Sequence, residues 1–133
     1  MRRDANDQQW QECKKEVRRR DENTCLLCSC FTAEELAIRR KENYCFGSFS
    51  LIDPAHYHAA STHQDEIYNP DNVFCLCRSC HESLDHMYSP LTGKHIDAET
   101  VRQYWDRIRA KREENLTHRD GPDLLGMFNF DLD

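Results

Sequence analysis

Two pairs of cysteines share the spacing of metal-binding thiolates. Cys25 and Cys28 form one Cys-x-x-Cys pair, and Cys77 and Cys80 form a second, with 48 residues between the pairs. Two thiolates at this spacing can reach one ion, and Zn²⁺ accepts four of them in a tetrahedron at about 2.3 Å. The four cysteines therefore predict a structural zinc site that joins two distant segments of the chain.

Such a site would supply stability that the composition lacks. The 133-residue chain is long enough for one modest domain, but only 38% of its residues are hydrophobic and 32% are charged. Structural zinc can contribute on the order of 10 kcal/mol to folding, which suits a small apolar core. Cys30 and Cys75 are weaker candidate ligands, because each stands in a Cys-x-Cys arrangement with the wrong spacing.

Further candidate ligands lie beside the second cysteine pair and between the two pairs. His81 follows Cys80 directly, and Asp85 follows His81 by four residues. Residues four apart share one face of a helix, so His81 and Asp85 can meet the same ion. A second histidine group, Asp53-Pro-Ala-His56-Tyr-His58, lies between the cysteine pairs.

Local patterns predict the elements that must position these residues. A capping box of Thr32 and Glu35 begins one expected helix, and Asp97 caps another. Asp53-Pro54 is expected to end a strand, which places His56 in a loop. The expected elements are helices over residues 5–20, 32–42, 77–87 and 98–115, and strands over 48–52 and 73–76.

In this order the motifs resemble those of the HNH endonucleases, whose catalytic unit is two strands and a helix around one metal ion. The resemblance covers roughly residues 20–95 and rests on four segments: Thr24-Cys-Leu-Leu-Cys28, Ile52-Asp-Pro-Ala-His56-Tyr57, Asn72-Val-Phe-Cys-Leu-Cys77 and Arg78-Ser-Cys-His-Glu-Ser-Leu-Asp85. It implies an α+β fold, with a small zinc-stapled ββα-metal (His-Me finger) core and flanking N- and C-terminal helices.

The resemblance also implies a mechanism for hydrolysing DNA. His56 would be the general base, Asn72 would hold the histidine loop by hydrogen bonds, and His81 would bind a catalytic Mg²⁺ or Mn²⁺ ion. The expected products carry 5′-phosphate and 3′-hydroxyl ends.

One position departs from the pattern of the family. Many members place a metal-binding Asp or His directly before the base, where this chain has Ala55. Asp53 or Asp85 would then supply the carboxylate of the catalytic ion, and His58 is an alternative base or ligand. The choice between the two carboxylates stays open.

Charge is unevenly placed along the chain. The net charge is −6, but residues 1–20 carry seven Lys or Arg against four acids, whereas residues 113–133 carry one Arg against six acids. A basic helix near the N-terminus predicts contacts with DNA phosphates, and a solvated helix face is the alternative. The predicted contacts are Lys14, Lys15, Arg18, Arg19, Arg20 and Arg78.

We expect one domain over residues 1–133. Its parts are a basic helical extension (1–22), the HNH and zinc core (23–95), a helix (96–116) and an acidic, apolar tail (117–133). The sequence has no signal-peptide pattern and no apolar run near the roughly 20 residues that span a bilayer. We therefore expect a soluble cytoplasmic protein with no membrane partner. The resemblance is to units of bacteriophages, mobile elements or restriction systems, which places it in a bacterial or phage-infected cell.

Two other functions compete with the nuclease. A zinc-stabilised module that only binds DNA or RNA needs the cysteines, but does not need His56, Asn72 and His81 together. An adaptor would recruit a protein partner through residues 121–133, although this segment could equally pack on the domain's own core. The remaining histidines are expected at the surface: His63, His86, His95 and His118.

Overall fold

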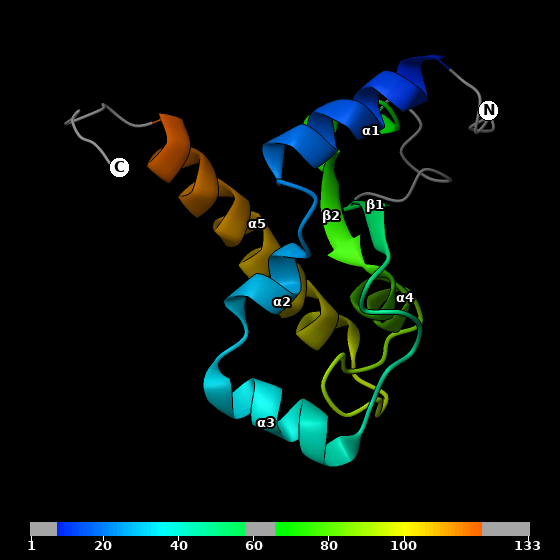
Figure 1. Cartoon of the computed structure of the whole chain (residues 1–133). Coiled ribbons are helices and arrows are strands. Elements are labelled where there is room, and N and C mark those ends of the chain that lie inside the picture. The colour runs from blue at the N-terminus through cyan, green and yellow to red at the C-terminus, as the bar shows by residue number, and fades with distance from the viewer. Residues whose placement is uncertain (1–7, 58–65, 121–133) are drawn as a thin grey trace.

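The computed structural model describes residues 8–57 and 66–120, with side chains up to residue 117 (Figure 1). The predictions for His58, His63, the side chain of His118 and residues 121–133 lie outside this part. The fold is α+β, with helices around a small antiparallel sheet. Its elements are α1 (Gln8–Arg20), α2 (Leu26–Cys30), α3 (Ala33–Glu42), β1 (Ile52–His56), the 3₁₀ turn η2 (Pro70–Asn72), β2 (Val73–Cys77), α4 (Arg78–Asp85) and α5 (Ala98–Asp120).

The sheet pairs β1 with β2, so that Ile52 lies opposite Cys77 and His56 opposite Val73. Successive side chains of a strand point to opposite faces, so Asp53 and His56, three residues apart, lie on different faces. β2 is buried along its whole length. The other edge of β1 pairs with no strand among the described residues.

The first strand lies four residues later than the sequence predicts. Asp53, Pro54 and His56 all belong to β1, instead of ending a strand and starting a loop. A proline is tolerated in an edge strand, where its missing N–H breaks no ladder hydrogen bond. The predicted strand over 48–52 instead crosses the start of α4, where Ser48 and Leu51 accept backbone hydrogen bonds from Ser79 and Arg78 at 3.2 and 2.8 Å.

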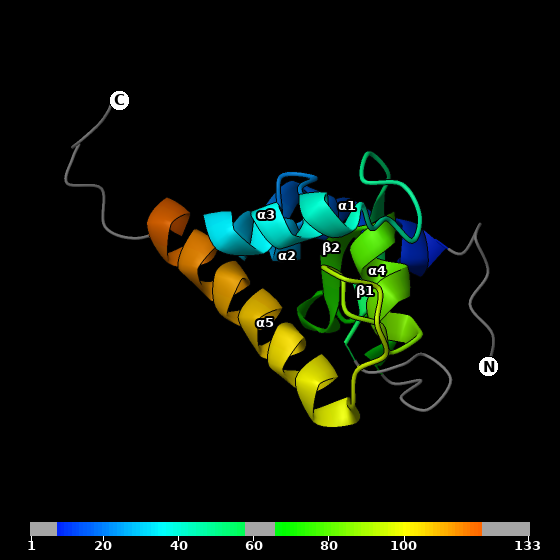
Figure 2. The same ribbon diagram turned by 90° about the horizontal axis from the view of Figure 1, so that it is seen from below.

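Two apolar clusters lie on the two faces of the sheet. Under α1, the predicted stripe of Trp10, Cys13 and Val17 packs on Val73 and Cys75. On the other face, α2, α4 and α5 enclose a larger cluster, and α5 runs along one side of the molecule beside α2 (Figure 2). The predicted stripe of α5 faces this cluster, with its two most buried members at Trp105 and Ile108.

The predicted helix ends agree with the structure where a side chain caps them. Thr32 and Glu35 form the capping box of α3, and the Thr100 N–H donates to Asp97 at 2.8 Å before the first turn of α5. The short helix α2 was not predicted, because five residues are too few to show a helical period. No helix among residues 8–57 and 66–120 is long and apolar enough to cross a membrane.

A buried ion pair joins the end of α1 to β2. Arg20 donates to both carboxylate oxygens of Asp21 at 2.7 and 2.8 Å, and to the carbonyl oxygens of Pro70 and Val73. Asp21 in turn accepts from the backbone N–H of Cys75 at 3.0 Å. Arg20 is only 7% exposed, so the prediction that it contacts DNA is wrong.

Candidate metal centres

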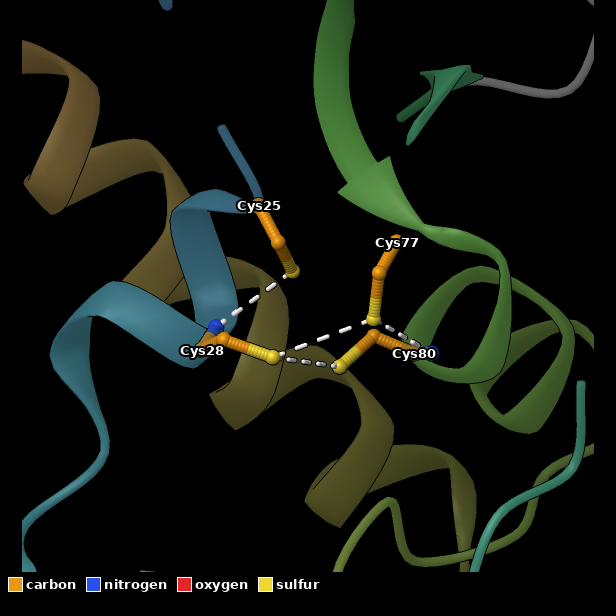
Figure 3. A group of neighbouring side chains, drawn as sticks. All are labelled: Cys25, Cys28, Cys77 and Cys80. Carbon is orange, nitrogen blue, oxygen red and sulfur yellow. Dashed lines mark hydrogen bonds between the residues drawn. The ribbon is translucent and has the colours of Figure 1, made fainter. Parts of the chain in front are cut away.

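The four predicted zinc ligands converge on one point (Figure 3). All four sulfurs lie within 4.8 Å of one another, and Cys28 Sγ is 3.8 Å from Cys77 Sγ and 3.7 Å from Cys80 Sγ. Tetrahedral zinc with bonds of about 2.3 Å separates its sulfurs by about 3.8 Å. The cluster therefore has the donor type, number and spacing of a structural zinc site.

The two cysteine pairs are built in the same way at the starts of two helices. Cys25 caps α2 and accepts from the Cys28 N–H at 3.4 Å, and Cys77 caps α4 and accepts from the Cys80 N–H at 3.5 Å. N–H donors at the start of a helix stabilise thiolates. Each pair thus presents one capping sulfur and one sulfur from the following turn.

Electrostatics in the cluster favour a bound cation. The pKa of Cys28 is lowered, and the largest cause is its hydrogen bond with Cys25. The pKa values of Cys77 and Cys80 are raised instead, and the largest cause is again a hydrogen bond with Cys25. Four thiolates this close repel one another, and Zn²⁺ with four thiolates still leaves a charge of −2. Arg39 offsets part of it by donating to Cys28 Sγ at 3.5 Å.

The rival cysteines lie elsewhere. Cys30 donates to the carbonyl oxygen of Leu27, and Cys75 lies under α1 in the other apolar cluster. Burial raises the pKa of Cys75 to about 12, so it remains a neutral thiol near neutral pH. The preference for the Cys-x-x-Cys pairs agrees with this geometry.

A second group of predicted ligands meets at His81. Asp53 of β1 lies 3.1 Å from His81 Nδ1, and Asp85, one turn further along α4, lies 3.4 Å from His81 Nε2. Both candidate carboxylates therefore contact the same imidazole, one at each nitrogen. The three groups form a row, and among the described residues only the cysteine cluster gathers three or more ligand atoms around one point.

Arg78 takes part in the same group. Its guanidinium donates to both oxygens of Asp53, at 2.9 and 3.0 Å. Burial raises the pKa of Asp53, but the hydrogen bonds from Arg78 and His81 outweigh it, so the net shift is downward. Asp53 is therefore an ionised carboxylate. Of its two partners, Arg78 has a side chain that is 44% exposed.

His56 lies on the opposite face of the sheet. Its ring stacks on Trp10 of α1, with centroids 5.1 Å apart and planes at 16°, and its Nε2 lies 3.0 Å from the carbonyl oxygen of Ile67. A carbonyl oxygen can only accept, so Nε2 carries a proton and Nδ1 is the basic nitrogen of the neutral ring. His56 contacts neither Asp53 nor His81 through any hydrogen bond or ion pair in the described residues.

Asn72 is buried at the turn before β2. Its side-chain amide donates to the backbone carbonyl oxygen of Glu66 at 3.2 Å. The backbone carbonyl oxygen of Asn72 accepts from the Tyr57 N–H at 2.8 Å. Tyr57 and Glu66 border the segment that follows His56. Asn72 therefore fixes both ends of that segment.

The other predicted DNA contacts differ in their availability. Lys15 and Arg19 are exposed, with Arg19 paired to Glu16 at 2.6 Å. Lys14 lies 5.7 Å from the ring centroid of Trp10, and Arg18 donates to the carbonyl oxygen of Ile52, next to Asp53. The basic end of α1 therefore lies beside the start of β1.

Sequence patterns gave no sign of Arg39, because its contact with Cys28 depends on how α3 lies relative to α2. Comparisons with protein-family models, with curated proteins and with solved structures found no match. What the site can do must therefore be argued from its residues and their geometry.

Proposed function

We propose that this protein is a metal-dependent DNA endonuclease of the HNH type, with a zinc site that holds its strand–strand–helix unit together. The observation that carries this proposal is the contact between Asp53 and His81. These residues are far apart in the sequence and come from the first strand and the helix. A half-buried carboxylate and an imidazole that meet in this way form a typical binding pair for a divalent ion.

Asp53 and His81, through Nδ1, would hold a Mg²⁺ or Mn²⁺ ion, and Asp85 at the opposite ring nitrogen would orient the imidazole. When bound, such an ion supplies Lewis-acid stabilisation of charge on the scissile phosphate and on the leaving oxygen. Arg78 must then release Asp53, and its half-exposed side chain can turn toward a DNA phosphate instead. This exchange would reconcile the observed ion pair with the predicted DNA contact.

His56 would act as the general base. The hydrogen bond from Nε2 to Ile67 makes Nδ1 the nitrogen that takes a proton from water. A phosphodiester lying across the open edge of β1 can be approached from both faces of the sheet. His56 would reach it from the α1 face, and Asp53 and His81 from the α4 face. Asn72 would help to keep His56 in place, because its backbone carbonyl oxygen accepts from the N–H of the next residue, Tyr57.

Cleavage of supercoiled plasmid in Mg²⁺ or Mn²⁺ tests this function. Asp53→Asn and His81→Ala should each lower the cleavage rate by roughly 100-fold, because a ligand of the ion is lost. The matched control is Glu82→Gln, which removes a charge from α4 at a side chain whose nearest described partner is Arg78, 4.0 Å away. Zinc content should be equal in all four proteins.

A zinc-stabilised binding module is the second candidate. The observation that favours it is the Arg78–Asp53 pair, which neutralises Asp53 without a divalent ion. DNA binding without cleavage in any divalent ion would support this module and contradict the nuclease. A recruiting role for residues 121–133 remains a separate proposal, outside the described residues.

A further inference from the structure

A cavity of about 510 Å³ lies beside the last turn of α3, and Arg39 in its wall also contacts Cys28 of the cysteine cluster. Ligand pockets typically measure about 300–1,000 Å³, so one nucleotide would fit. Its walls come from α3 and the segment that follows it, and its main lining residues are Leu36, Arg39, Arg40, Tyr44, Cys45 and Phe49.

The walls combine an aromatic surface with positive charge. Phe49 is 45% exposed, so part of its ring is open to a ligand. Arg40 is exposed, and its side chain makes no hydrogen bond or ion pair with the described residues. The Arg39 guanidinium lies 4.6 Å from the Phe49 ring centroid, and its Nη1 is buried without a hydrogen-bond partner among the described residues. The pocket thus offers a stacking surface together with two cations.

Helix electrostatics alone do not account for this arrangement. Basic residues in the last turn of a helix offset its dipole, and Arg39, Arg40 and Lys41 all stand in the last turn of α3. Lys41 serves that purpose outside the cavity. Arg39 and Arg40 differ from it because they line the cavity next to an exposed aromatic ring.

The cavity is directly connected to the helix that carries His81. The Tyr44 hydroxyl group lies 2.7 Å from Ser83 Oγ, and the Phe46 N–H donates to Ser79 Oγ at 3.2 Å. Gly47 packs so closely on Arg78 that a Cβ there would lie 3.0 Å from Arg78 Cγ. In Figure 1 the chain runs from α3 past α4 to β1. The same segment therefore lines the cavity and contacts the residue that pairs with Asp53.

We propose that this cavity binds an unpaired nucleotide of the DNA substrate. The base would stack on Phe49, its phosphate would accept hydrogen bonds from Arg40, and the Arg39 guanidinium beside the Phe49 ring would add positive charge. A base inside a duplex has both faces covered by its neighbours, so only an unpaired base can stack in this way. This role of the pocket rests on the proposed nuclease function. The substrate class would be single-stranded DNA or DNA with an unpaired segment.

Binding of a fluorescein-labelled single strand of about 12 nucleotides, a length within the usual range of such sites, tests the pocket. Fluorescence anisotropy is measured on zinc-loaded protein without Mg²⁺ or Mn²⁺, so that no cleavage is needed. Arg40→Ala and Phe49→Ala should each weaken binding roughly tenfold, the usual scale of one stacking or phosphate contact. The matched controls, Lys41→Ala and Leu51→Ala, remove a charge and an exposed apolar side chain outside the cavity and should leave binding unchanged.

A second readout reports stacking directly. A strand that contains 2-aminopurine should lose fluorescence on binding wild type, and this quenching should disappear in Phe49→Ala. Because Phe49 contacts Arg39, and Arg39 contacts Cys28, zinc content and the melting temperature are measured for each variant. If Phe49→Ala loses zinc, the comparison of Arg40→Ala with Lys41→Ala tests whether the cavity binds DNA.

Equal losses of affinity for the single strand in Arg40→Ala and Lys41→Ala would contradict the proposed pocket. So would wild-type protein that binds no single strand, or that binds a fully paired hairpin equally well. The two proposals fail in different ways. A protein that binds single strands through the pocket but never cleaves them would contradict only the nuclease. A protein that cleaves, with binding indifferent to Arg40 and Phe49, would contradict only the pocket.

Discussion

The eight cysteines lie in different environments, and these environments determine how reactive each thiol should be. Four form the candidate zinc cluster, Cys45 is exposed, Cys30 is partly buried, and Cys13 and Cys75 are buried between α1 and the sheet. Burial raises the pKa of Cys13 and Cys75, which keeps both as poorly reactive thiols. These environments give each class a different expected reactivity.

Alkylation with iodoacetamide near neutral pH checks this division. Cys45 should react first, because it is exposed. Cys25, Cys28, Cys77 and Cys80 should react together, and only after a chelator removes zinc. Peptide mass mapping follows each site over time. Early labelling of the four cluster cysteines in zinc-loaded protein would contradict a zinc site at these residues.

Spacing was enough to predict the cysteine cluster, because a Cys-x-x-Cys pair at a helix start brings its two sulfurs together locally. The contact of His81 with Asp85 was predictable for the same reason. Spacing alone did not predict the contact of Asp53 with His81, which depends on the register between β1 and β2. The resemblance gave Asp53 only as one of two candidate carboxylates for the ion at His81. A shift of one residue in β1 would move Asp53 to the α1 face and His56 to the α4 face.

Among the elements, α3 is tied to α5 by one ion pair. Arg107 donates to both carboxylate oxygens of Glu35 at 2.8 Å, and Glu35 also completes the capping box of α3. The hydrogen bonds from Arg107 lower the pKa of Glu35 to about 2, from an ordinary value of 4.5. Since the folded-state pKa is depressed, the stabilisation is complete above the ordinary pKa and is lost as the pH falls toward about 2.

Glu35→Gln should therefore lower the free energy of unfolding by about 1 kcal/mol at neutral pH. The loss should be similar at pH values down to about 5, and the difference from wild type should narrow below about 4.5. Thermal melting of wild type and variant over this range measures it. Glu34→Gln is the control, because Glu34 stands in the same first turn but is exposed. An equal effect of both substitutions would contradict the role of Arg107.

Element types were easier to predict than their positions. The stripe of α5 and the caps of α3 and α5 agree with the structure because they depend on nearby residues. The strand carrying His56 was placed too early, because Asp53-Pro54 resembles a strand end when no partner strand is considered. The buried Arg20 was missed for a related reason: its partners, Asp21, Pro70 and Val73, come mostly from distant segments.

For the whole molecule, a net charge of −6 leaves few places for DNA to bind. Exposed cations at the end of α1 lie beside the start of β1, where Arg18 contacts Ile52. Lys15 and Arg20 stand close together in sequence but differ in environment, since Lys15 is exposed and Arg20 is buried. Their substitution should separate binding from stability.

Lys15→Ala should weaken DNA binding, lower the slope of log affinity against log salt by about 1, and leave the melting temperature unchanged. Arg20→Met should instead destabilise the fold by about 3–5 kcal/mol, because Asp21 would stay buried without its partner. Salt-titrated anisotropy and thermal melting separate the two effects. An equal slope of log affinity against log salt in Lys15→Ala and wild type would mean that α1 does not face the DNA.

The most direct test of the proposed nuclease is the cleavage rate of His56→Ala on supercoiled plasmid in Mn²⁺, compared with wild type at equal zinc content. The proposed mechanism predicts metal-dependent cleavage by wild type that leaves 5′-phosphate ends. It predicts a loss of roughly 100-fold or more in the variant, because the group that takes the proton from water is removed. Cleavage at the wild-type rate in His56→Ala would contradict it.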